Sequence, residues 1–98
     1  MPEIRFVVRW PDDATTSCYS PSLVVRELLE LGAAYPLGEF LALAREALTI
    51  ASERVRQRYG SPCSRAMLQL RQIEERAERF ASIEGAMVHV VAFEPVLS

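Results

Sequence analysis

The sequence predicts a single α+β domain, in which a small sheet carries its helices on one face. Three observations support this fold class: apolar residues alternate with polar ones near the N-terminus, recur every three or four residues in the middle, and form a continuous run near the C-terminus. We expect an N-terminal β-hairpin, a short helix, two long antiparallel helices and a final strand that completes a three-stranded sheet. Because no linker divides the 98 residues, one domain spanning residues 1–98 is expected.

The first element is a predicted β-hairpin. Apolar side chains at Ile4, Phe6, Val8 and Trp10 would share one face of the first strand. Residues 11–13 are typical of a turn, and residues 14–19 would form the return strand. Pairing Trp10 with Ala14 sets Cys18 opposite Phe6 on the buried face, whereas a slip of one residue would bury Tyr19 instead. We favour the first register.

A short helix is expected next. Ser20 and Pro21 are typical of a helix start, because the serine accepts a hydrogen bond from a free backbone amide and the proline has none to leave unpaired. This helix would run to about Leu31 and stop at Gly32.

Two long helices follow. From Pro36 to Tyr59, apolar residues form one stripe at spacings of three and four, and Gly60 ends the pattern. Ser61 and Pro62 repeat the earlier start signal. The next helix would place one apolar seam against the first, and residues 82–85 would end it; the seam consists of Met67, Leu70, Ile73, Ala77 and Phe80.

The final predicted strand, residues 87–93, is apolar on both faces. Val88, Val90 and Ala92 would line one side, and the residues between them the other. A strand of this kind needs cover on both faces, whereas the two long helices cover one. We therefore expect a homodimer, with the short helix or the C-terminal tail as the alternative cover. The expected interface residues are Val7, Tyr19, Met87, His89, Val91 and Phe93.

The amino-acid composition argues against several kinds of active site and binding partner. All 11 basic residues are arginine, so neither a Schiff-base lysine nor a phosphate-binding loop lysine is present. His89 is the sole histidine, so we expect neither a histidine metal centre nor a bound cofactor. We favour a binding protein over an enzyme. The net charge of −2, with arginines interspersed among glutamates, argues against nucleic acid. Neither a membrane span nor a signal peptide is evident, so we expect a cytoplasmic protein with two free thiols.

Cys63 is the one candidate catalytic residue. It would lie in the first turn of a helix, where free amides and the positive end of the helix dipole favour a thiolate. Together with Ser61, Ser64 and Arg65 it would form an anion or ligand site. The structural alternative is a packing residue beneath the helix start.

The second face of the sheet is the other candidate site. Arg5, Arg9, Tyr19 and His89 would share this face and bind a small carboxylate, or form the rim of the dimer interface. We favour the interface.

Several segments together resemble the small nitrogen-starvation-response protein family found in bacterial gene clusters beside a nitrilase. These segments are Arg5-Phe6, Arg9-Trp10-Pro11, residues 18–25, Tyr35-Pro36-Leu37, residues 45–56 and Tyr59-Gly60. The resemblance implies an accessory protein in nitrogen scavenging from nitriles or cyanide, with proteins of the same cluster as partners. It implies no established biochemical activity and supplies no catalytic residues. A thiol-dependent enzyme or carrier using Cys63, and a sensor of a small anion or metabolite, remain as alternatives.

Overall fold

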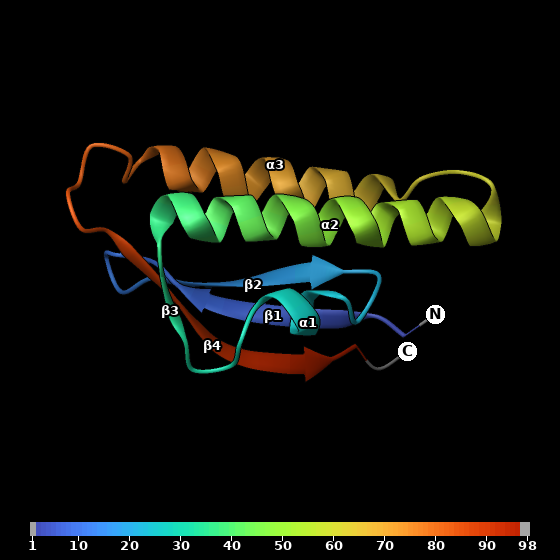
Figure 1. The fold of residues 1–98 in the computed structure, drawn as a ribbon, viewed down its shortest axis with the longest axis horizontal. Coiled ribbons are helices and arrows are strands. Elements are labelled where there is room, and N and C mark those ends of the chain that lie inside the picture. The colour runs from blue at the N-terminus through green and yellow to red at the C-terminus, as the bar shows by residue number, and fades with distance from the viewer. Residues whose placement is uncertain (1, 97–98) are drawn as a thin grey trace.

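The computed structural model describes residues 2–96 and has two layers, a four-stranded antiparallel sheet and two long helices on one of its faces (Figure 1). The strand order is β2-β1-β4-β3, so the first and last strands form the centre of the sheet. This confirms the predicted α+β class. The elements are β1 (Ile4–Arg9), β2 (Thr15–Ser20), α1 (Val25–Leu28), β3 (Ala34–Pro36), α2 (Leu37–Tyr59), α3 (Ser64–Glu78) and β4 (Met87–Pro95).

The β1–β2 hairpin has the predicted register. Phe6 pairs with Cys18, and both side chains are buried. The backbone N–H of Trp10 donates to the carbonyl of Ala14 at 2.8 Å and closes the turn. Within the turn, the Asp12 carboxylate accepts a hydrogen bond from the Ala14 N–H at 3.0 Å, as short polar side chains often do in turns.

The strand β3 was not predicted. Its three residues pair with Met87, Val88 and His89 at the edge of the sheet. A segment this short carries too few residues to show the alternation by which a strand is recognised in a sequence. The ladder continues beyond it, because the Gly32 N–H donates to the Val90 carbonyl at 2.8 Å.

The helix α1 is shorter than predicted. It covers four residues, and the backbone becomes extended at Leu29 instead of continuing to Leu31. Ser20 accepts a free backbone N–H as predicted, that of Ser22 at 3.3 Å, and Ser22 in turn accepts the N–H of Val24 at 3.3 Å. Because Val25 and Leu29 are both buried, tertiary packing holds this segment, and β-branched residues there favour a helix only weakly.

The core centres on Trp10 at the end of β1. Its ring lies edge-on to Phe40 of α2 at 5.7 Å between centroids, and it stacks on Phe80, just after α3, at 6.0 Å. The indole N–H donates to the Thr16 hydroxyl oxygen at 2.9 Å. Trp10 is 1% exposed, so one side chain joins the sheet to both long helices.

The inner face of α3 differs in part from the predicted seam. Ile73, Ala77 and Phe80 are buried as expected, whereas Met67 is 39% exposed. Ala66 and Gln69 are buried in its place. Because the core also contains Ala44 and Ala47 of α2, small residues on both helices allow a close approach that a methionine would prevent.

Two glycines, one at each end of α2, provide a matched test of its geometry. Gly60 ends the helix at φ +88, with its N–H donating to the Arg56 carbonyl at 2.8 Å, whereas Gly38 lies in the first turn. An added methyl group meets no atom within 4 Å at either position. We expect Gly60→Ala to lower the free energy of unfolding by about 1 kcal/mol, because left-handed backbone is strained for alanine. Gly38→Ala should raise it by up to about 1 kcal/mol.

Urea denaturation followed by circular dichroism measures both changes. The same sign of effect at the two positions would contradict this assignment of the helix end.

Candidate functional site

The first candidate site is the sheet face opposite the two long helices, which we call the outer face (Figure 1). Cross-strand pairing places Arg5 beside Glu94, Val7 beside Ala92, and Arg9 beside His89 on this face. The centre is apolar, the ends carry charge, and the side chains are half-buried or exposed. The outer face consists of Arg5, Val7 and Arg9 of β1, Thr15 and Ser17 of β2, Ala34 and Pro36 of β3, and Met87, His89, Ala92 and Glu94 of β4.

A β-bulge decides which residues of β4 reach the outer face. Val7 pairs with Ala92 but Val8 pairs with Val90, so Val91 is an extra residue in β4 and is 37% exposed. A bulge reverses the alternation of side chains beyond it. Phe93, which strict alternation placed on the outer face, therefore lies opposite Phe6 and packs against the core.

Tyr19 also departs from the expected open position. The guanidinium of Arg65 lies over its ring at 3.9 Å from the centroid, and the side chain is 6% exposed. Its backbone N–H donates to Oε1 of Gln69 at 2.9 Å, so α3 covers this edge of the sheet. Burial first, and then the nearby charges of Glu3 and Cys63, raise the pKa of Tyr19 to about 12.

The structure brings together part of the predicted anion site around Cys63, because Cys63 and Ser64 line one hollow while Arg65 lies over Tyr19. Cys63 is the half-buried N-cap of α3, and its N–H donates to the Ser52 hydroxyl oxygen at 3.2 Å. Ser61 and Ser64 are exposed. Arg65 is directed to Tyr19, and the hollow beside the thiol is lined by Ser64 and Arg71 as well as by the less polar Pro62, Met67 and Leu68.

The remaining reactive side chains do not form a common catalytic or metal-binding centre. Cys18 is fully buried, and this burial raises its pKa to about 12, so it stays a protonated thiol near neutral pH. Among residues 2–96, no group of three or more His, Cys, Asp and Glu side chains is placed to hold a metal ion. No helix in the same range is long and apolar enough to cross a bilayer.

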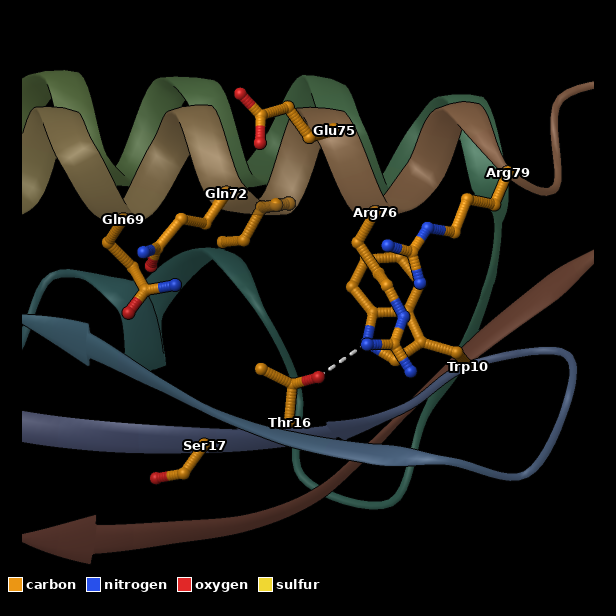
Figure 2. Close-up of a pocket in the computed structure, with 9 residues that line it drawn as sticks. Trp10, Thr16, Ser17, Gln69, Gln72, Glu75, Arg76 and Arg79 are labelled. Atoms are coloured by element: carbon orange, nitrogen blue, oxygen red, sulfur yellow. Dashed lines mark hydrogen bonds between the residues drawn. The ribbon is translucent and has the colours of Figure 1, made fainter.

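A pocket of about 270 Å³ between α3 and β2 was missed by the sequence analysis (Figure 2). Arg76 and Arg79 extend from α3 toward the end of β1, and Gln69 and Thr16 line the same hollow. The Nε atom of Arg76 is buried and has no hydrogen-bond partner. The sequence shows arginines and glutamates at successive positions of a helix, a pattern typical of a solvated face, so it did not reveal this pocket.

The fold and these sites define a small two-layer α+β protein with an open, partly apolar sheet face and a pocket lined by Arg76 and Arg79. The model of the nitrogen starvation-induced protein NitG family matches residues 5–93. The chain therefore belongs to this family, as the resemblance of its motifs predicted. The comparisons with curated proteins and with solved structures give no match.

The burial of Cys18 and Tyr19 predicts a loss of stability at alkaline pH. Their pKa values rise from 9.0 and 10.0 to about 12, so folding holds both groups in their neutral forms. The stabilisation from these groups is complete below about pH 9 and is lost as the pH rises toward 12, because the unfolded chain releases their protons more readily.

Urea denaturation at several pH values between 7.5 and 11 measures this slope. Cys18→Ala and Tyr19→Phe should each flatten it, whatever their effect at neutral pH. A wild-type free energy of unfolding that stays constant over this range would contradict the prediction.

The two thiols should also differ in reactivity. In the folded protein we expect Cys63 to react with iodoacetamide within minutes, and the fully buried Cys18 to react only when the protein opens. Mass spectrometry of the labelled protein distinguishes the two sites. Rapid labelling of Cys18 in the wild-type protein, or rapid labelling of the Cys63→Ser variant, would contradict the full burial of Cys18.

Proposed function

We propose that this NitG-family chain is a non-catalytic, cytoplasmic accessory protein of the nitrogen starvation response, and that it acts as a homodimer joined through the outer face. The observation that carries the proposal is the pattern of this face, with an apolar centre flanked by an arginine on one central strand and a glutamate on the other. Arg5 of β1 and Glu94 of β4 lie side by side at the same end of the sheet.

The apolar centre supplies the attraction. Val7 and Ala92 form this centre on the two central strands, with Val91 exposed beside them, and Met87 adds apolar surface farther along β4, beyond the Arg9–His89 pair. Burying apolar surface contributes about 25 cal/mol per Å². The strands are short, so the covered area falls near the lower end of the roughly 1,200–2,000 Å² of specific interfaces. We therefore expect a dissociation constant in the micromolar range.

The charges make the face self-complementary. Packed sheets align their strands to within about 30°. A two-fold axis that runs along the strands between β1 and β4 sets β1 of each copy over β4 of the other. Arg5 then faces Glu94 of the second copy, twice per dimer, as the symmetry of such an interface requires. A second copy of the chain is therefore complementary to this face in charge.

The positions of the reactive groups fit an accessory role better than a catalytic one. Cys18 lies in the core, Cys63 at the start of α3, and His89 on the outer face. General acid–base or thiol catalysis needs such groups within hydrogen-bond reach of one another. We propose that the protein acts together with the enzymes encoded in a nitrilase-containing gene cluster, in nitrogen scavenging from nitriles or cyanide. Tagged protein should co-purify with those enzymes from nitrogen-starved cells.

Charge reversal tests the interface. Wild-type protein should sediment as a dimer at about 200 µM and dissociate on dilution. We expect Arg5→Glu and Glu94→Arg each to weaken association at least about tenfold, because like charges then face each other, and the double variant to restore it. Glu46→Arg, an equal change of charge on the exposed side of α2, is the matched control and should leave association unchanged.

Circular dichroism of each variant separates loss of association from loss of fold, because Arg5 and Glu94 are also neighbours within one sheet. A wild-type protein that remains monomeric at about 200 µM would contradict the proposal. Failure of the double variant to associate would contradict the two-fold arrangement.

A further inference from the structure

We infer that the pocket between α3 and β2 binds a small organic carboxylate, held by Arg76 and Arg79. This inference goes beyond the proposed self-association, because the pocket is lined mainly by α3 and includes neither Arg5, Glu94 nor the apolar residues of the outer face, although Ser17 of β2 borders both.

The two arginines act together because of their spacing. Arg76 lies in the last turn of α3 and Arg79 is its C-cap, still in helical conformation, so the two Cβ atoms lie about 5–6 Å apart on one side of the helix. Figure 2 shows both guanidinium groups directed to the same region above the end of β1. The Nε atom of Arg76 is shielded from solvent and lacks an acceptor. A buried guanidinium N–H is costly unless a hydrogen-bond acceptor satisfies it, and an anion in the pocket supplies one.

The pocket keeps its positive charge. Within residues 2–96, the ion pairs join Arg45 to Glu74 and Arg56 to Glu53, so neither pocket arginine is neutralised by a carboxylate there. Glu75 also lines the pocket, but its carboxylate is directed away from the two guanidinium groups (Figure 2).

The neighbouring polar groups add donors. Oε1 of Gln69 accepts the Tyr19 N–H at 2.9 Å, which leaves the amide nitrogen of Gln69 to donate on the pocket side. The hydroxyl oxygen of Thr16 accepts the Trp10 indole N–H at 2.9 Å, so its own proton is available to an acceptor. A ligand that presents several acceptor oxygens matches this arrangement.

Size and apolar lining favour an organic anion over a bare inorganic one. A water molecule occupies about 30 Å³ in the liquid, so the pocket has room for a ligand of roughly five to ten non-hydrogen atoms. Trp10 and Ile73 contribute apolar surface that suits a short carbon chain. A planar carboxylate fits the fork of a guanidinium through two parallel hydrogen bonds.

The fluorescence of Trp10 provides a local readout, because this is the one tryptophan of the chain and it lines the pocket. Sodium succinate is the probe, with sodium phosphate and sodium chloride at matched ionic strength as comparisons. We expect a saturable change in emission with succinate, confirmed by calorimetry, and weaker binding of phosphate.

Arg76→Gln and Arg79→Gln should each weaken succinate binding at least about tenfold. Arg71→Gln, on the same helix but outside the pocket, is the matched control and should change it less than about twofold. Should Arg76→Gln fail to fold, the exposed Arg79 still carries the test.

Three results would overturn the inference: no saturable response to succinate up to about 10 mM, binding that survives both substitutions, or phosphate binding as tight as that of succinate. Sedimentation of the same variants keeps this test separate from the dimer, because Arg76→Gln and Arg79→Gln should leave association unchanged.

Discussion

The pairing of β1 with β4 joins the two ends of the chain at the centre of the sheet, and the other elements are positioned from it. β2 extends the sheet on one side through the hairpin, and β3 extends it on the other (Figure 1). The side chains that this pair directs toward the helices, including Phe6, Val8 and Val90, lie in the core. Those directed away form the centre of the outer face. The core and the candidate interface are therefore two sides of one strand pair.

The parts of the fold that depend on local rules were predictable from the sequence. The turn at residues 11–13 sets the register of the hairpin, and Gly60 ends α2 because its conformation suits a residue without a side chain. The bulge at Val91 and the strand β3 depend on partners far away in the chain. Because the apolar run of β4 is unbroken, its sequence does not show the residue at which side chains change the face to which they point.

The candidate sites likewise divide into residues that local position in a strand predicts and residues that only long-range contacts place. Val7, Met87 and His89 lie on the outer face as predicted from their positions in strands. Tyr19 is covered by Arg65, a contact between residues 46 positions apart, and this contact also removes Arg65 from the expected anion site. The pocket of Arg76 and Arg79 required knowledge of which side of α3 faces β2. In the sequence these two arginines are indistinguishable from Arg71, which lies on the exposed surface.

The hydrogen bond from the Tyr19 backbone to Gln69 has a consequence for the form of any assembly. Unpaired amides along an outermost strand invite further strands to add, which leads to open-ended fibres. Here a glutamine side chain occupies one such amide, and the opposite border of the sheet is a strand of three residues. Lateral growth is therefore obstructed on both sides, whereas the proposed two-fold contact through the outer face would close after one pair.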